Sequence, residues 1–262
     1  MPSNRLPTVT VVTPSYNQAD YLEETIRSVL NQSYSYLEYI IVDGGSTDGS
    51  VEIIRKYSDK LAWWISEPDQ GQTDAINKGF AKANGDILAW LNSDDTYLEG
   101  AISEAVDYLE ANPEVGMVYG DANLINDDGN ILGRFPARQT DFRKLMRGFV
   151  HIPQQAAFFR AQLWHQVGPL DPTFYFAMDY DLWVRLSQFA PLHYHPRLWA
   201  NFRLHGGAKS LEADDRCWPE MVRVHRREGG NRFSWLTLKA AIRPLVYGWM
   251  PMNLRLWIRQ NF

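Results

Sequence analysis

The sequence is poor in cysteine and lacks long apolar runs. Cys217 is the only cysteine among 262 residues, which excludes a disulfide framework within the chain and a cysteine-based metal site. No apolar run reaches the ~18 residues that a spanning helix needs. The polar residues 1–5 are followed only by a short apolar stretch at residues 8–13, so we expect no secretory signal. A reducing compartment fits this composition, and we predict a cytoplasmic location.

The charge is unevenly distributed. The formal net charge is −5, but residues 216–262 carry a net +7, which leaves −12 on residues 1–215. The acidic body argues against nucleic-acid binding. The basic segment also holds Trp235, Trp249 and Trp257, a composition typical of a peptide lying on an anionic membrane surface. Packing on the domain or a contact in a homo-oligomer is the alternative, and we expect prolines 244 and 251 to break the segment into short helices.

Strand and helix patterns alternate through the first half. Strands are predicted at 8–13, 38–42, 62–66, 86–91 and 115–119, and helices at 20–31, 51–57, 72–83 and 100–111. This order predicts an α/β fold with a mainly parallel, Rossmann-like sheet and helices on both faces. The second half is less regular. We expect a hairpin at 123–135, a strand at 156–160, a helix at 179–189 and an extended segment at 193–204.

Four polar loops follow the predicted parallel strands, at residues 14–17, 43–49, 67–71 and 92–95. Ligands of such sheets bind beyond the carboxyl ends of the strands, so these loops are the candidate site. In the last loop the adjacent Asp94 and Asp95 repel one another unless a cation is present, and oxygen ligands suit Mg²⁺ or Mn²⁺. Capping of the next helix is the alternative role for this pair.

Asp43 ends the second predicted strand and is followed by two glycines. Its carboxylate is placed to accept hydrogen bonds from a nucleotide base or ribose, and the glycines permit close backbone approach. An aspartate-rich turn without a ligand is the alternative. No Gly-Lys-Ser/Thr follows, so this is not a phosphate-binding P-loop.

Five motifs occur in a specific order: TPSYNQ at 13–18, IVDGGSTDGS at 41–50, EPDQGQTDAINKG at 67–79, GDILAWLNSDD at 85–95 and MDYDLW at 178–183. Together they resemble glycosyltransferase family 2, the inverting enzymes with the GT-A fold. The resemblance covers residues 8–210. It implies transfer of a sugar from a nucleotide sugar, commonly a UDP-sugar, to an acceptor hydroxyl, with Mn²⁺ or Mg²⁺ assisting departure of the diphosphate.

The resemblance also implies a donor site. Its residues would be Thr13, Pro14, Tyr16, Asp43, Asp69, Asn77, Asn92, Asp94 and Asp95. Asn92 departs from the first aspartate of the family's Asp-x-Asp, which leaves Asp94 as metal ligand, with Asp95 sharing or replacing it. His205, in a segment that resembles a closing loop, would complete the metal shell or touch the diphosphate. A packed histidine without such a role is the alternative.

The general base is implied by the last motif. Asp179 matches the aspartate of the family's Glu-Asp pair, although Met178 replaces the glutamate. Asp181 is the second candidate, with a structural role expected. Inversion is a single displacement, so one carboxylate takes the acceptor proton as the leaving group departs from the opposite face.

Acceptor contacts are expected from the second half of the chain. Gln154 and Gln155 lie between the two halves and are suited to binding hydroxyls. Trp183 or Trp164 would stack on a sugar, unless these indoles belong to the core.

We divide the chain into a nucleotide-sugar-binding half at residues 1–120, an acceptor-binding and catalytic half at 121–215, and a basic helical tail at 216–262. The acceptor would be a saccharide or a lipid-linked saccharide of polysaccharide or glycan biosynthesis, met at the inner face of the cell membrane. Two other functions stay open: a nucleotide-sugar-binding module without turnover, and a nucleotidyltransferase. The second should carry a basic, Gly-rich loop after the first strand, which residues 13–17 lack.

Overall fold

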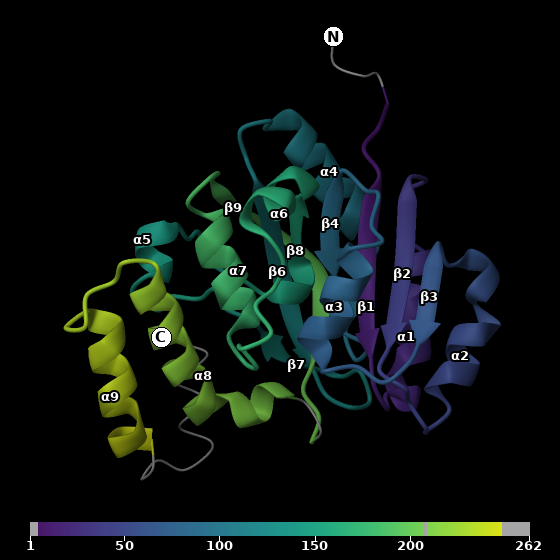
Figure 1. Ribbon diagram of the computed structural model, residues 1–262. Coiled ribbons are helices and arrows are strands. Elements are labelled where there is room, and N and C mark those ends of the chain that lie inside the picture. Colours follow the sequence, from purple (N-terminus) through teal and green to yellow (C-terminus); the bar gives the residue numbers. More distant parts are fainter. Residues whose placement is uncertain (1–4, 207–208, 248–262) are drawn as a thin grey trace.

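The computed structural model describes residues 5–206 and 209–247. A single nine-stranded sheet runs through it in the order β3-β2-β1-β4-β8-β6-β9-β5, with β7 paired to β6 (Figure 1). The strands are β1 (Val9–Ser15), β2 (Leu37–Asp43), β3 (Trp63–Ser66), β4 (Ile87–Trp90), β5 (Thr96–Tyr97), β6 (Met117–Ile125), β7 (Ile131–Arg134), β8 (Ala157–Arg160) and β9 (Leu192–Arg203).

The helices follow the strands along the chain. They are α1 (Ala19–Leu30), α2 (Ser50–Lys56), α3 (Gln72–Phe80), α4 (Ala101–Ala111), α5 (Phe142–Leu145), α6 (Ala161–Val167), α7 (Met178–Leu186), α8 (Lys209–Arg227) and α9 (Trp235–Tyr247). Two 3₁₀ turns, η1 (Ser58–Lys60) and η2 (Gln154–Ala156), complete the described elements.

Strand direction confirms the predicted fold class. Strands β3, β2, β1 and β4 are mutually parallel, as are β6 and β9, whereas β8 runs antiparallel between β4 and β6. The expected hairpin forms from β6 and β7. Because the first four strands are parallel, their carboxyl ends share one edge of the sheet, at the bottom of the view in Figure 1.

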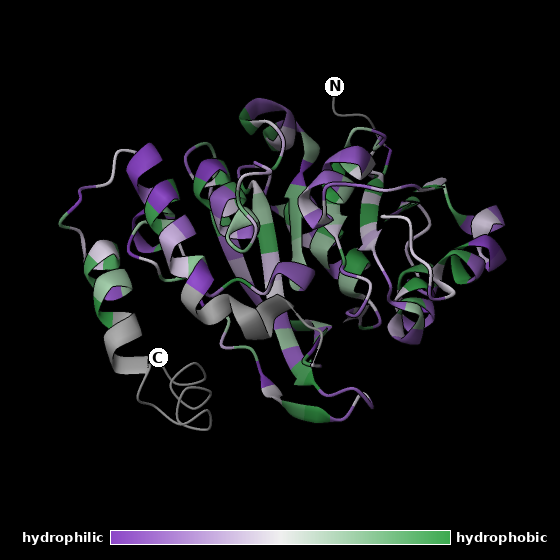
Figure 2. Ribbon diagram, turned by 60° about the horizontal axis from the view of Figure 1, so that its bottom comes forward, coloured by the Kyte–Doolittle hydropathy of each residue, from purple (hydrophilic) through white to green (hydrophobic). Residues whose placement is uncertain are grey.

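Alternation along the strands creates a core on each face of the sheet. In β2, Ile40 and Val42 join a core with α3, α6, α7 and α8, whereas Tyr39 and Ile41 join one with α1, α2 and α4. Figure 2 shows the strands mostly in apolar colours and hydrophilic residues on the surrounding helices. Helices therefore cover both faces, as predicted.

Helix α3 lies unusually close to the sheet. A Cβ placed on Gly79 would lie 2.4 Å from Cγ1 of Val12, so only glycine permits this approach. Gly71, immediately before the helix, has φ of 103°, a conformation that glycine adopts at little cost. Gly71 therefore sets the start of α3 at the carboxyl edge, and Gly79, near its end, allows the helix to approach β1 closely.

The C-terminal segment packs into the domain over its described part. Helix α8 crosses residue 215, and β6 crosses residue 120, so the sheet and helices are continuous across both proposed boundaries. Met221, Val224 and Leu236 are buried in the same core as α7. Pro244 does not end α9, which continues to Tyr247, contrary to our expectation. Pro251, Trp249 and Trp257 lie outside the described residues.

Within the part of the chain that the structure describes, no helix combines the length and the apolar character needed to cross a membrane.

Candidate functional site

The loops after β1 and β2 form one hydrogen-bonded unit. The carbonyl of Ser15 accepts from the Gly44 N–H at 2.9 Å, and the Asn17 side chain accepts from the Thr47 N–H at 2.9 Å. The Asn17 N–H donates in turn to Ser46 Oγ at 2.7 Å. Asn17 has φ of 50°, a left-handed conformation that asparagine tolerates better than most residues. Two of the four predicted loops are therefore held together at the carboxyl edge.

Asp43 is fully buried beneath this unit. Its carboxylate accepts hydrogen bonds from the N–H groups of Gly45 (3.1 Å) and Ser46 (2.9 Å) and from the hydroxyls of Ser46 (2.5 Å) and Ser66 (2.7 Å). These hydrogen bonds link the end of β2 to β3 and to the loop between β2 and α2. Its contact with a base stays a prediction, and it would require one of these donors to turn away.

The three residues predicted around the base differ in exposure. Thr13 is buried and its hydroxyl lies 3.0 Å from the Tyr39 hydroxyl, and Pro14 is also buried. Tyr16 is 62% exposed at the end of β1. Among the three, Tyr16 therefore offers the aromatic surface on which a base can stack.

Asp69 lies where the third loop meets the second. Its Oδ1 accepts from the Gly71 N–H at 2.8 Å, and a Cβ on Gly44 would lie 2.9 Å from its Oδ2. Asn77 has a different environment from the one expected. Its amide exchanges two hydrogen bonds with the backbone of Leu170, both 2.9 Å long. Asn77 thus holds the segment before α7, and its contact with the donor stays a prediction.

Asn92, two residues after β4, bonds to two glutamine side chains and to the carboxyl group of Asp95. Its Oδ1 accepts from Gln72 Nε2 at 2.7 Å, and its Nδ2 donates to Asp95 at 3.3 Å and to Gln154 Oε1 at 3.4 Å. Gln154 Nε2 donates to the carbonyl of Trp90 at 2.6 Å. The structure therefore brings Asn92 together with Gln154, one of the two predicted acceptor-binding glutamines.

The two adjacent aspartates have opposite environments. Asp95 is fully buried and its Oδ1 accepts from the Arg203 N–H at 2.9 Å, and burial, reinforced by the charge of Asp94, raises the pKa of Asp95. Asp94 keeps 18% of its side chain exposed, and its Oδ2 lies 3.0 Å from His205 Nε2. The hydrogen bond with Asp94 raises the pKa of His205. Asp94 is therefore the carboxylate that faces outward from this loop.

Asp94 and His205 suit a divalent cation that also binds phosphate. Neighbouring ligands of octahedral Mg²⁺ lie about 2.9 Å apart, because each bond is about 2.1 Å and the bonds are perpendicular. The 3.0 Å hydrogen bond between Asp94 and His205 has a similar length, so the two side chains would need little movement to share an ion. Among the described residues no three His, Cys, Asp or Glu side chains gather as a metal site. Mg²⁺ commonly takes one or two carboxylates and completes its shell with substrate phosphates and water, so Asp94 supplies a carboxylate of the kind that such an ion needs.

Arg203 holds the loop that carries Asp94 in place, and it was not predicted from the sequence. It is 1% exposed, and its guanidinium donates to Glu24 Oε2 (2.6 Å) and to the carbonyls of Asp94 (3.0 Å), Asn126 (3.0 Å) and Asp127 (2.9 Å). It thereby joins α1, the β4–β5 loop and the β6–β7 turn. Its position two residues before His205 was the only signal in the sequence.

Tyr21 of α1 packs against the ring of His205. Its ring centroid lies 4.8 Å from that of His205, and its hydroxyl donates to Asp127 at 2.8 Å. The hydrogen bond with Asp127, with burial, raises the pKa of Tyr21 to about 12. The His205 ring is thus held between Tyr21 and Asp94.

The first turn of α7 lies beside the first turn of α3. Thr73 Oγ1 donates to Met178 Sδ at 3.0 Å, and Gln72, the preceding residue of α3, reaches Asn92. Asp179, half-buried, follows Met178, and its Oδ1 accepts from the Tyr180 N–H at 2.7 Å. The predicted base therefore lies in a turn of α7 that contacts α3. The same turn of α3 contacts the loop after β4 through Gln72.

Asp181 has the structural role expected of it. The carboxylate is fully buried and pairs with Arg185, at 3.0 Å, and with Arg227 of α8. Its geometry leaves no exposed oxygen for an acceptor.

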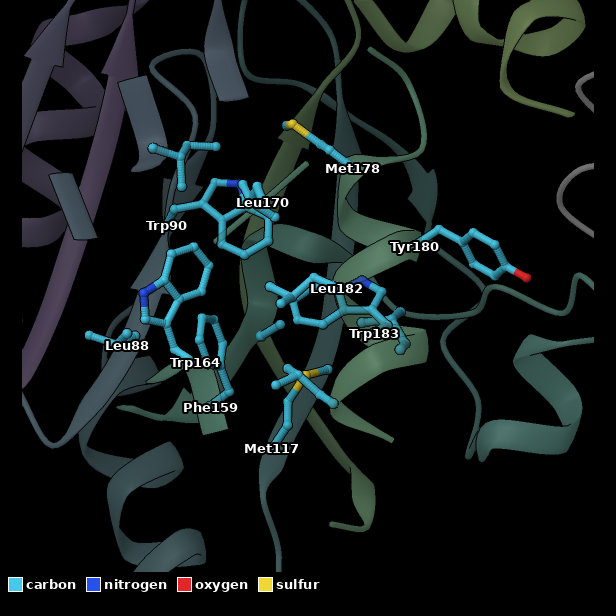
Figure 3. Close-up of a cluster of buried hydrophobic side chains, with 14 of the residues drawn as sticks. Leu88, Trp90, Met117, Phe159, Trp164, Leu170, Met178, Tyr180, Leu182 and Trp183 are labelled. Atoms are coloured by element: carbon cyan, nitrogen blue, oxygen red, sulfur yellow. The ribbon is translucent and has the colours of Figure 1, made fainter. Parts of the chain in front are cut away.

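Two predicted acceptor residues are corrected by their burial. Trp183 is 0% exposed and stacks on Trp90, with ring centroids 5.4 Å apart and planes at 18° (Figure 3). Trp164 belongs to the same cluster, and Gln155 is 4% exposed. A stacking platform or a hydroxyl-binding amide must reach solvent, so Trp183 and Gln155 serve the core instead.

Solved structures with a similar fold identify the class. TarS of S. aureus, solved with UDP-GlcNAc, matches with a TM-score of 0.70 at 15% identity, over 95% of this chain and 77% of that one. The mannosyltransferase PcManGT of Pyrobaculum calidifontis, solved with GDP-Man and Mn²⁺, matches with a TM-score of 0.64 at 19% identity, over 97% and 79%. The fold is thus that of the GT-A glycosyltransferases.

The family follows from sequence. The model of "Glycosyl transferase family 2" matches residues 10–167, and the chain belongs to this family. An uncharacterized glycosyltransferase of Mycobacterium tuberculosis is 36% identical over 185 residues, 69% of each chain. Other curated relatives are longer, and the chain spans about a third of their length. Membership supports a glycosyltransferase, as the resemblance implied.

Proposed function

We propose that this chain transfers a sugar from a nucleotide sugar, with a UDP-sugar as the leading donor, to an acceptor hydroxyl with inversion. The observation that carries the proposal is the pair of the partly exposed Asp94 and the buried His205, 3.0 Å apart. Asp94 lies in the loop after β4 and His205 just after β9, at the edge where the loops after β1, β2 and β3 also meet.

The donor would extend along this edge. Tyr16 offers a surface for the base, and Asp69 lies beside Gly44 in the neighbouring loop. Asp94 and His205 would hold Mn²⁺ or Mg²⁺ against the diphosphate. When bound, the ion neutralises the charge that develops on the leaving group, which is worth several kcal/mol. PcManGT was solved with Mn²⁺ and a nucleotide sugar, which supports this ion chemistry.

The acceptor side would be served by Asp179. Its carboxylate would take the proton of the acceptor hydroxyl while the hydroxyl oxygen attacks the anomeric carbon. The proton ends on Asp179, the new bond is the glycosidic bond, and the nucleoside diphosphate leaves. Gln154, half-buried at the end of β4, is the remaining predicted contact for an acceptor hydroxyl.

A nucleotide-sugar panel tests the proposal. We expect a UDP-sugar with Mn²⁺ to raise the melting temperature, since a ligand at one hundred times its Kd adds about 2.7 kcal/mol to the free energy of unfolding. Chelation of the metal with EDTA should remove most of this shift. Release of nucleoside diphosphate in the presence of an acceptor extract would then report turnover.

The outcomes of the panel separate the competing functions. Binding without any release of diphosphate would support a binding module, a role that the departures at Asn92 and Met178 keep open. Release of pyrophosphate from a nucleoside triphosphate would support a nucleotidyltransferase. A panel in which no nucleotide sugar changes the melting temperature contradicts the donor site.

A membrane contact is proposed for α9. Trp235, Leu238 and Ile242 are each about half exposed, and their spacing puts them on one side of the helix, opposite the buried Leu236. Together with the +7 charge of residues 216–262, this stripe suits the anionic inner face of a cell membrane, where a lipid-linked acceptor would be met.

Vesicle sedimentation tests the contact. The protein should pellet with phosphatidylserine-containing vesicles and not with phosphatidylcholine alone. Leu238→Ser with Ile242→Ser should weaken pelleting about tenfold or more, because two exposed apolar anchors are lost. The matched control is Ile131→Ser with Leu132→Ser on β7, two apolar residues that are more exposed than Leu238 and Ile242. Equal pelleting of both variants, or a dimer that the α9 change dissociates, contradicts a membrane contact.

A further inference from the structure

The segment before α7 is held by a residue of another helix. Glu220 of α8 accepts three consecutive backbone N–H groups, from Tyr175 at 3.0 Å, Phe176 at 2.7 Å and Ala177 at 2.8 Å. Ala177 is the N-cap residue of α7, whose own side chain cannot accept a hydrogen bond. Both oxygens of one carboxylate therefore order the backbone that leads into the helix.

Helix α8 is itself firmly placed. Met221 and Val224 are buried in the core shared with α7. Arg223 donates to Thr173 Oγ1 at 2.8 Å and lies 4.6 Å from the centroid of the Phe174 ring. Because α8 contacts the segment 173–177 at several points, Glu220 approaches it from a fixed direction.

We propose that Glu220 is a positioning residue for Asp179, which lies two residues after the last N–H that Glu220 accepts. This role rests on the proposed function of Asp179 as the base. Hydrogen bonds to an ionised carboxylate are about twice as strong as those between neutral groups, so three of them fix the entry angle of α7. That angle determines where the Asp179 carboxylate meets an acceptor hydroxyl. Sequence motifs give no sign of this, because Glu220 lies outside them.

Glu220→Gln keeps the shape of the side chain but replaces one accepting oxygen with an amide that donates. We expect kcat to fall about 10–100-fold, since a misplacement of about 1 Å has effects of this size. The affinity for the nucleotide sugar should not change, because the donor loops do not contact Glu220. Glu220→Asp, which keeps both accepting oxygens on a shorter stem, should recover part of the rate.

The control is Glu228→Gln, the same change at the residue that follows α8. Glu228 accepts from Gln188 and Arg227 and from none of the three N–H groups that Glu220 holds, so kcat should stay at the wild-type value. All variants are assayed well below their melting temperatures, where a purely structural glutamate leaves kcat unchanged. If Glu220→Gln does not fold, Glu220→Asp gives the same comparison.

Two failures can be told apart. Wild-type kcat in folded Glu220→Gln and Glu220→Asp, with an inactive Asp179→Asn, overturns the role of Glu220 alone. Wild-type kcat in Asp179→Asn overturns the assignment of the base, and the positioning role fails with it.

Discussion

Asp179→Asn should reduce sugar transfer by about 10²–10⁴-fold, because the amide cannot accept the proton of the acceptor hydroxyl. The substitution changes almost no volume, and its remaining oxygen can still accept from the Tyr180 N–H, now 2.7 Å from Oδ1. Donor affinity should therefore stay close to wild type. The check is the transfer rate with a labelled donor, together with the thermal shift produced by the same donor and Mn²⁺.

Asp181→Asn is the matched control on the same helix. It removes a buried charge that pairs with Arg185 and Arg227, and breaking a buried pair costs about 3–5 kcal/mol. We expect a lower melting temperature and a near-normal rate in the protein that stays folded. A wild-type rate in Asp179→Asn, with a stable but inactive Asp181→Asn, would move the role of the base to Asp181.

The parallel half of the sheet was predictable because its signals are local. Apolar strand patterns, helix periodicity and polar loops at strand ends all lie within short stretches of sequence. The position of the loops at one edge follows from parallel pairing, and the contacts of Ser15, Asn17 and Asp69 with the β2–α2 loop agree with it.

The division of roles between Asp94 and Asp95 was not predictable. Arg203 N–H turns Asp95 inward, and His205 meets Asp94, so both partners come from residues more than 100 positions along the chain. The local sequence shows two adjacent carboxylates and does not indicate which of them faces outward. The two carboxylates acquire different environments only when β9 pairs with β5 and brings Arg203 and His205 to them.

The same reason explains why the burial of Trp183 and the packing of the C-terminal segment on α7 could not be predicted. A tryptophan on a helix is equally suited to a sugar platform and to a core, and the buried stack with Trp90 requires β4, which lies 93 residues earlier. The basic composition of residues 216–262 indicates only that charged side chains of this segment lie on the surface. It contains no sign that Met221 and Glu220 face α7.

Asp94→Asn should remove most of the Mn²⁺ dependence of donor binding and lower the transfer rate by about 10³-fold or more. Loss of several kcal/mol of charge stabilisation at the leaving diphosphate has this effect, since each 1.4 kcal/mol is about tenfold in rate. The Asp94 side chain is partly exposed, so the metal-free variant should melt close to the wild-type temperature. Donor thermal shifts with and without Mn²⁺, and the transfer rate, measure these effects.

Asp95→Asn should produce the opposite pattern. Its buried carboxylate accepts from Arg203 N–H and from the Asn92 amide, and an amide in its place puts a donor against one of these donors. An unsatisfied buried group costs about 1–3 kcal/mol, so the melting temperature should fall while the Mn²⁺-dependent donor shift survives. If Asp95→Asn removes that shift and Asp94→Asn keeps it, the ion is held from the buried side, and the pair of Asp94 and His205 is only a hydrogen bond.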